Sequence, residues 1–390
     1  MGMSCAQNST SNNSSAITSL NHLVSDSLTL GCERTDVYIP WLKDKRVGLL
    51  VNHTSLVKDR HLVDTLLRLG VDIKTIFAPE HGFRGVVDAG KKVVGGVDAK
   101  TGIPIVSLYG SQKKPSMQQL EGLDWVIFDV QDVGVRFYTY ISSLHYLMEA
   151  CAENNVGVIV LDRPNPNGDY VDGPVLDLKF RSFVGMHPIP IVHGLTVGEL
   201  ALMINGMGWL DNGVKCRLSV VEMLGYNHQL MYVPPVKPSP NLPNYRSIRL
   251  YPSLCLFEAT QMSVGRGTEF PFQVVGYPDE KMGDFTFTPV AIEGMDLAPL
   301  HQNKVCYGVD LRDMDKVPSF TLQYFFDFYH RWGNQTPFVN RISFFNLLAG
   351  TDELLKQIEQ GWTEERIRQS WKPNIDRFLE MRSNYLLYKP

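Results

Sequence analysis

The sequence predicts a doubly wound α/β domain followed by an α+β domain. The chain has 390 residues, which is more than a single ordinary core needs, since domains usually hold roughly 100–200 residues. From about residue 40, short apolar runs alternate with amphipathic stretches, a pattern typical of strand–helix units in a parallel sheet. Beyond about residue 206 this regular alternation is lost, which indicates a change of architecture.

Apolar runs predict five strands in the first domain, over 45–52, 72–79, 104–110, 124–130 and 156–162. Helical periodicity predicts helices over 61–70, 140–155 and 196–208. The last of these begins with Thr196 and carries Glu199 three residues later, which matches a capping box.

The second half of the chain mixes strands and helices. A proline-dense stretch over 233–244 suits neither a helix nor a central strand, so it is expected to cross between domains as an ordered segment. Strands are expected over 215–224 and 271–278, followed by helices over 319–332, 343–360 and 363–385. We therefore divide the chain into a tether over 1–20, the first domain over 21–205 and the second over 206–390.

The first twenty residues are rich in Ser, Asn and Thr, which is typical of a flexible tether. Cys5 stands near its start, as the lipid-carrying cysteine does in a mature bacterial lipoprotein. The alternative is an N-terminus without a specific role. If the first interpretation holds, the protein works outside the cytoplasm, periplasmic or secreted, with Cys5 as a lipid anchor.

Charge and composition exclude several classes of partner. With 37 Lys and Arg against 41 Asp and Glu, the net charge of −4 argues against binding to nucleic acid or to anionic lipid. No apolar run approaches the roughly 20 residues of a membrane span, so the chain is not expected to be transmembrane. The six cysteines are scattered without zinc-ligand spacing; no metal is expected, while a disulfide stays open.

Ionisable side chains gather in the loops that follow three predicted strands. Ligands of open parallel sheets bind at the carboxyl ends of the strands, where these loops meet. The loops over 79–85, 131–140 and 162–174 supply Glu80, His81, Arg84, Asp132, Arg136, Tyr138 and Arg163. A structural ion-pair network has the same composition, so this cluster is a candidate site.

Two loops of the second domain are candidates for the other wall of the site. They contain Asn241, Glu258, Arg266 and Glu269 among Gly, Ser, Thr and Pro. Neither GxGxxG after the first strand nor GxxxxGK[ST] occurs, which argues against dinucleotide and nucleoside triphosphate cofactors, and no cofactor is expected. The absence of GxSxG argues against a serine hydrolase of the usual α/β type.

Several of these segments carry a family resemblance, above all PEHGFRG at 79–85, FDVQDVGVRFYTYI at 128–141, LDRPNPNG at 161–168, PSPNLP at 238–243 and SVGRGTEFPF at 263–272. On these motifs, and over about residues 40–385, the sequence resembles the NamZ exo-β-N-acetylmuramidases, formerly DUF1343. The resemblance implies a Rossmann-like parallel-sheet domain and a smaller α+β domain with a cleft between them. It also implies release of N-acetylmuramic acid from the non-reducing ends of peptidoglycan fragments. One departure is His53, where relatives more often have Pro or Gln.

Glycoside hydrolysis generally uses two carboxyl groups, one as acid and one as nucleophile or base. With this resemblance, Glu80 is expected to be the acid, assisted by His81. Asp132 is the first choice for the second carboxylate, with Glu258 and Glu269 in reserve. Alternatively, the 2-acetamido carbonyl of the substrate is the nucleophile, and the sequence does not separate the two routes.

Muramic acid differs from N-acetylglucosamine by a lactyl carboxylate, which an arginine fork recognises well. Arg136, Arg163 and Arg266 are the candidates, with Tyr138 as a wall and with Arg84 and Asn241 as further substrate contacts. The partners expected are therefore peptidoglycan-derived muramic-acid saccharides; the oligomeric state stays open. Rival hypotheses are a non-catalytic glycan-binding protein and an amidase or deacetylase, although the latter would need a metal or an activated Cys or Ser that the sequence does not display.

Overall fold

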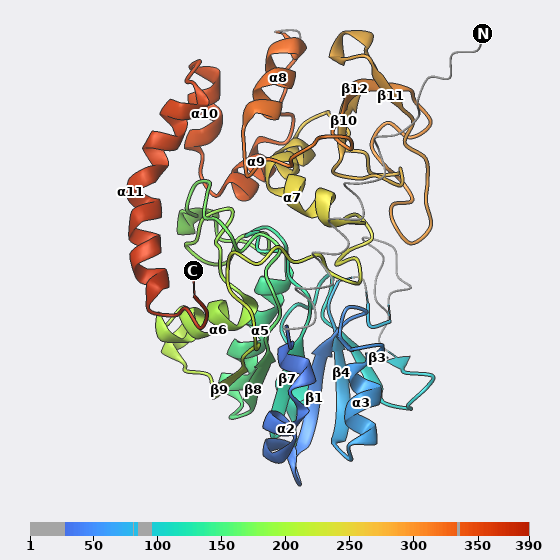
Figure 1. Ribbon diagram of the computed structural model, residues 1–390, viewed down its shortest axis with the longest axis vertical. Coiled ribbons are helices and arrows are strands. Elements are labelled where there is room, and N and C mark those ends of the chain that lie inside the picture. Colours follow the sequence, from blue (N-terminus) through green and yellow to red (C-terminus); the bar gives the residue numbers. More distant parts are fainter. Residues whose placement is uncertain (1–27, 81, 85–95, 334–335, 390) are drawn as a thin grey trace, which may run out of the picture.

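The computed structural model of the protein describes residues 28–80, 82–84, 96–333 and 336–389. The predicted tether with Cys5, and also His81, lie outside these described residues. Figure 1 shows an α/β part, below, and a second part with helices and a small sheet, above. The predicted combination of an α/β and an α+β region is confirmed.

The α/β part is built on a seven-stranded sheet with the order β5-β6-β4-β1-β7-β8-β9. Its six parallel strands are β1 (Arg46–Val51), β4 (Asp72–Ala78), β6 (Pro104–Ser107), β7 (Trp125–Asp129), β8 (Gly157–Leu161) and β9 (Leu218–Val221). The short β5 (Gly96–Val97) runs antiparallel at one edge. Numbered along the chain, the parallel strands have the order 3-2-1-4-5-6 of a Rossmann-like sheet. All five strands predicted for the first domain are present.

Helices cover both faces of this sheet: α5 (Tyr140–Glu153) and α6 (Val197–Gly206) on one, and α2 (Thr35–Tyr38) and α3 (Leu62–Arg68) on the other. Alternate residues of a strand therefore pack into two separate cores. On β7, Val126 and Phe128 join the core of α5 and α6, whereas Ile127 joins the core of α2 and α3. This double burial explains why the central strands β7 and β8 are nearly continuous apolar runs in the sequence.

The strand expected over 215–224 forms as β9, but its assignment to the second domain is wrong. β9 pairs in parallel with β8, Val158 opposite Leu218 and Leu161 opposite Val221. Val221 is buried in the core of α2 and α3, so β9 extends the large sheet after the crossover through α6. The change of texture near residue 206 thus marks a polar connection within the α/β part.

The second part contains a three-stranded antiparallel sheet and most of the later helices. The sheet has the order β10-β12-β11, from β10 (Val274–Tyr277), β11 (Phe285–Phe287) and β12 (Cys306–Asp310). The helices are α7 (Tyr245–Leu254), α8 (Gln323–Trp332), α9 (Ile342–Ala349), α10 (Glu353–Glu359) and α11 (Glu364–Ser383). The one helix predicted over 343–360 is divided into α9 and α10, because Gly350 adopts φ 75° and ends α9.

Short elements complete the described chain: α4 (Met117–Leu120) and a hairpin of β2 (Leu56–Val57) and β3 (Arg60–His61). No helix in the described part of the chain is long and apolar enough to span a membrane. The five cysteines that the structure describes are buried and unpaired, so none of them forms the disulfide that the sequence left open.

The two parts share one hydrophobic core. Residues of α5, such as Leu144, belong to the same buried cluster as Phe257 and Phe325 of the second part. The chain also returns at its end, because α11 runs back beside the α/β part and brings the C-terminal segment close to α6 (Figure 1). There the backbone N–H of Leu387 donates to Glu199 Oε1 at 2.9 Å.

Candidate active site

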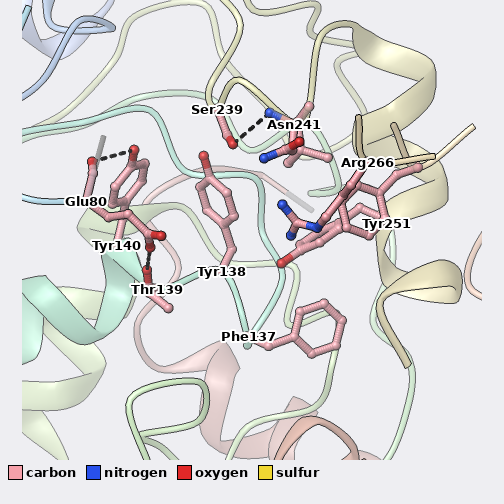
Figure 2. Close-up of a pocket in the computed structure, with 11 residues that line it drawn as sticks. Glu80, Phe137, Tyr138, Thr139, Tyr140, Ser239, Asn241, Tyr251 and Arg266 are labelled. Carbon is pink, nitrogen blue, oxygen red and sulfur yellow. Dashed lines mark hydrogen bonds between the residues drawn. The ribbon is translucent and has the colours of Figure 1, made fainter. Parts of the chain in front are cut away.

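A pocket lies between the carboxyl edge of the large sheet and the second part. It holds about 490 Å³ of empty space, part of it open to solvent. The α/β part contributes the loops after β4 and β7, and the other walls are the proline-dense segment, α7 and the loop before β10. The lining residues are Glu80, Phe137, Tyr138, Thr139, Tyr140, Ser239, Asn241, Leu242, Tyr251, Arg266 and Phe272 (Figure 2). This is the sheet edge where ligands of open α/β folds bind.

Glu80 is the one carboxyl group among the described residues that line this pocket. It follows β4 after Pro79, and Thr139 Oγ1 donates to its Oε2 at 3.2 Å. Burial raises the pKa of Glu80 above its ordinary value, and the charge of Glu258 adds to the rise. Hydrogen bonds from Thr139 and Tyr109 lower the same pKa, but they only partly offset the effect of burial.

Side chains fill the crevice between β1 and β7, where the strand order of the sheet reverses. Asn52 Nδ2 donates to the hydroxyl of Tyr140 at 3.0 Å, and Asn52 Oδ1 accepts from Thr54 Oγ1 at 2.6 Å. Thr54 Oγ1 in turn accepts from the backbone N–H of Gln131 at 3.0 Å. A dinucleotide-binding fold keeps a glycine-rich turn at this place. Here a hydrogen-bonded network occupies it and orients Tyr140 at the pocket.

Arg266 projects from the second part into the pocket. Its Nε donates to Glu258 Oε1 at 2.6 Å, which fixes the plane of the guanidinium. The guanidinium carbon lies 5.2 Å from the centre of the Phe272 ring. Figure 2 shows the terminal nitrogens directed toward the space between Tyr138 and Tyr251. Among the described residues these nitrogens have no hydrogen-bond acceptor, so a ligand anion can take that place.

The proline-dense segment forms one wall of the pocket, and the α/β part holds it in position. The Tyr138 hydroxyl donates to the carbonyl of Pro238 at 2.9 Å, and His53 Nε2 donates to the carbonyl of Lys237 at 2.9 Å. Asn241 on the same segment is 2% exposed. Its side-chain Oδ1 is buried without a donor among the residues that the structure describes.

Arg136, a predicted substrate contact, lies outside this pocket. Its side chain is 0% exposed, and both terminal nitrogens donate to backbone carbonyls at 2.7–2.9 Å, those of Pro174, Ile189, Leu348 and Ala349. These contacts tie the α/β part to the end of α9 and leave no terminal nitrogen for a ligand. The expectation that Arg136 recognises a substrate carboxylate is therefore corrected to a structural role.

Arg163 and Arg84 are also corrected, because both are occupied by carboxylates elsewhere. Arg163 is buried, and its Nε donates to Asp129 Oδ1 at 2.6 Å at the end of β7. Arg84 forms ion pairs with Asp98 at 3.0 Å and with Asp64 at 3.4 Å. The structural ion-pair network that the sequence left open accounts for these two arginines.

The candidates for the second carboxylate do not line the pocket. Asp132 is buried, and its Oδ2 accepts from the backbone N–H of Gly134 at 2.7 Å. Burial raises the pKa of Asp132 to about 7. Glu269 is exposed at the surface. Glu258 lies in a neighbouring cavity that shares Arg266 with the pocket.

The structure adds residues that the sequence analysis did not select. Thr139 directly precedes the predicted helix 140–155. Helices that follow parallel strands begin at the carboxyl edge of the sheet, so this position was a signal that could have identified Thr139. Tyr251 lies within α7 next to Pro252 and has no comparable signal, because its helix looks like any other amphipathic segment. Tyr109, which acts on the pKa of Glu80, follows the strand β6 in the same way as the selected residues follow theirs.

Known proteins share this architecture over nearly the whole chain. A DUF1343 family protein from Bacteroides fragilis NCTC 9343 is 46% identical, with a TM-score of 0.86 over 93% of this chain and 99% of that one. A second DUF1343 protein from the same organism is 29% identical, with a TM-score of 0.80 and the same coverage. The peptidoglycan β-N-acetylmuramidase NamZ of Bacillus subtilis (strain 168) is 36% identical over 372 residues, 90% of this chain and 89% of its own length.

Family models account for both parts of the molecule. The N-terminal model of the exo-β-N-acetylmuramidase NamZ matches residues 47–246, and the C-terminal model matches residues 249–388. The first match contains the large sheet with Glu80, and the second contains Arg266 and the helices that follow. With the relatives above, these matches show that the chain belongs to the NamZ exo-β-N-acetylmuramidase family of glycoside hydrolases.

Proposed function

We propose that this protein is an exo-β-N-acetylmuramidase, which hydrolyses N-acetylmuramic acid from the non-reducing ends of peptidoglycan-derived saccharides. The observation that carries the proposal is the pairing, across one pocket, of a carboxyl group with a raised pKa and a guanidinium with free terminal nitrogens. Membership of the NamZ family supports it independently.

Glu80 suits the part of general acid. A glycosidic bond to a sugar breaks readily only if the departing oxygen receives a proton. Burial raises the pKa of Glu80, so a larger fraction of the carboxyl group is protonated near neutral pH. Thr139 Oγ1 holds one carboxyl oxygen at 3.2 Å, and the side chain lines the pocket where a leaving group would lie.

Arg266 suits recognition of the lactyl carboxylate. This carboxylate distinguishes muramic acid from N-acetylglucosamine, and a guanidinium can bind it through two parallel hydrogen bonds. Glu258 holds Nε, so the pair of terminal nitrogens remains for the ligand. Because its partner and the ring of Phe272 fix the guanidinium, little side-chain freedom is lost when a substrate binds.

The direct test is incubation with the disaccharide of N-acetylmuramic acid and N-acetylglucosamine, with the products separated by mass spectrometry. We expect both monosaccharides from the wild-type protein, and release that is slower by orders of magnitude from Glu80→Gln. Binding of the disaccharide without release by the wild-type protein would favour the rival hypothesis of a non-catalytic glycan-binding protein.

We also propose that the protein acts outside the cytoplasm, because its proposed substrate comes from the cell wall. The serine- and asparagine-rich composition around Cys5 supports an anchored lipoprotein. Metabolic labelling with a radioactive fatty acid tests the anchor: the wild-type chain should incorporate label and Cys5→Ala should not. Label in neither chain, with the protein found in the cytoplasm, would contradict this proposal.

A further inference from the structure

We infer that Asn241 accepts a hydrogen bond from the N–H of the substrate's 2-acetamido group, and that the carbonyl oxygen of this group is the nucleophile of the reaction. The inference rests on the proposed function and deepens it. It assigns the part that a second carboxylate plays in many glycosidases to the substrate itself.

The state of the Asn241 side chain is the first observation. Its Oδ1 is buried at the pocket and has no donor among the described residues, although the residue is only 2% exposed. Buried acceptors almost always have a donor, and Asn241 lines the pocket, where a ligand can supply one. The Asn241 backbone is fixed, because its N–H donates to Ser239 Oγ at 3.2 Å.

Neighbouring polar groups leave this acceptor for the ligand. The Tyr138 hydroxyl donates to the carbonyl of Pro238, and Thr139 Oγ1 donates to Glu80. Arg266 donates to Glu258, and among the described residues no hydrogen bond joins it to Asn241 Oδ1. An N-acetyl sugar supplies this donor, because its amide N–H is attached to the ring carbon next to the anomeric carbon. The carboxyl group of Glu80 and the guanidinium of Arg266 remain available for the leaving oxygen and the lactyl carboxylate.

The distribution of carboxylates is the second observation. Among the described residues that line the pocket, Glu80 is the one carboxyl group. Glu258 is held by Arg266 and lies in the neighbouring cavity, and Asp132 is buried outside the lining. A retaining enzyme of the two-carboxylate kind places its pair about 5–5.5 Å apart across the sugar. The described lining therefore offers no pair of carboxylates, and the inference assigns the nucleophile to the 2-acetamido group of the substrate.

The reaction then proceeds in two balanced steps. The acetamido oxygen forms a bond to the anomeric carbon, the bond from that carbon to the glycosidic oxygen breaks, and the Glu80 proton moves to the departing oxygen. The resulting oxazolinium ion keeps its N–H, which Asn241 Oδ1 accepts. Water next attacks the anomeric carbon, the bond to the acetamido oxygen breaks, and the Glu80 carboxylate takes the proton of the water. The product retains the β configuration.

Two experiments on the wild-type chain test the nucleophile. NMR of the first-formed sugar should show the β anomer, and aryl N-acetylmuraminides with mono-, di- and trifluoroacetamido groups should be cleaved progressively more slowly, since fluorine weakens the carbonyl nucleophile. An α anomer, or rates that ignore the fluorines, would overturn the inference and leave the proposed function intact. If no muraminide is cleaved at all, the proposed function itself fails.

Calorimetry tests the role of Asn241 without catalysis. Asn241→Leu should weaken binding of N-acetylmuramic acid by roughly 5- to 150-fold, because the amide N–H of the bound sugar would be buried without an acceptor. The same change should alter binding of 3-O-lactylglucose, which has no amide, much less. Asn241→Asp keeps the acceptor and should retain the preference for the amide. Equal losses for both sugars would overturn the assignment of Asn241 to the amide N–H. The NMR and fluoroacetamido experiments use the wild-type chain, so they do not depend on how these variants fold.

Discussion

Glu80 shows how the surroundings of a single residue prepare it for acid chemistry. The residue follows β4, and Thr139 donates a hydrogen bond to its carboxyl group. Burial raises the pKa of this group. Glu80→Gln keeps the size of the side chain and removes the proton. We expect cleavage of the natural disaccharide to fall by roughly 10²–10⁴-fold, with a smaller fall for a nitrophenyl glycoside, whose leaving group needs no proton. A folded variant with near-normal disaccharide cleavage would remove Glu80 from the mechanism.

The pH dependence of activity should follow the neighbours of Glu80. The acid acts while it is protonated, so activity falls on the alkaline side as pH rises through its pKa. The hydrogen bond from Tyr109 lowers this pKa, and the charge of Glu258 raises it. Tyr109→Phe should therefore move the alkaline limb of the kcat/KM profile to higher pH, and Glu258→Gln should move it to lower pH. Shifts of both variants in one direction would show that another group controls the limb.

Specificity for muramic acid should depend on Arg266. Its free terminal nitrogens face the pocket, and a lysine in its place offers no fork (Figure 2). Arg266→Lys and Arg266→Ala should each weaken muramic-acid substrates, the latter by roughly 2–5 kcal/mol if the charge pair is buried. Activity toward N-acetylglucosamine glycosides, measured in parallel as kcat/KM, should change less. An equal loss on both classes of substrate would assign the arginine a structural role.

The residues of the site could be predicted only as far as their loops. Residues after the strand ends were found because the rule for open sheets places them at one edge, and Glu80 and Tyr138 do lie at the pocket. Arg266 was selected from a loop of the second domain instead, and it also lines the pocket. The direction of each side chain was not predictable. Arg136 leaves the same loop as Tyr138 but points into the core, where carbonyl groups distant in sequence bind it. Such partners appear only once the chain is folded.

At the level of elements, the proline-dense segment forms a wall of the site without helix or strand, and hydrogen bonds from the α/β part hold it. His53 and Tyr138 each donate to a carbonyl of this segment at 2.9 Å. Burial lowers the pKa of His53, so the imidazole is neutral and donates through Nε2. His53→Ala should raise KM by roughly two- to tenfold with a smaller change in kcat, because the wall carrying Asn241 loosens.

His53→Gln is the matched control, because an amide restores a donor of similar reach. We expect its KM to lie close to the wild-type value rather than to the raised value of His53→Ala. If both variants behave alike, or if kcat alone changes, His53 does not position the wall. The contact also gives a local reason for His53 in a motif where the resemblance leads one to expect another residue.

Elements that bury apolar residues on both sides could be predicted well. The strands β1, β4, β7 and β8 match their expected ranges closely, since each contains a buried apolar run that ends at a polar turn. It was harder to predict which strands pair with each other. β9 was assigned to the wrong part because nothing within residues 215–224 identifies the neighbour of the strand, which the crossover through α6 determines. The division of α9 from α10 depended on one glycine, Gly350, whose φ of 75° the apolar pattern does not reveal.

At the scale of the whole molecule, contacts between distant segments hold the pocket together. Arg136 binds the end of α9, and the core continues from α5 into the second part. The C-terminal segment returns to the α/β part, where the Tyr388 hydroxyl donates to Asp162 Oδ2 at 2.7 Å and accepts from the backbone N–H of Met223 at 2.9 Å. None of these pairings has a local signature in the sequence, because each joins residues more than a hundred positions apart.

The C-terminal contact should stabilise the fold without taking part in catalysis. Tyr388 is buried, and Tyr388→Phe leaves the N–H of Met223 without its acceptor and Asp162 with one donor fewer. Since a buried polar group without a partner costs about 1–3 kcal/mol, the free energy of unfolding in urea should fall by that amount. Tyr307→Phe is the control, since the hydroxyl of Tyr307 makes only a 3.4 Å contact with Glu280 near the surface and its loss should change little. Because Tyr388 does not line the pocket, kcat/KM of the folded variant should equal that of the wild type; a loss of activity at unchanged stability would instead mean that the C-terminal segment controls the geometry of the site.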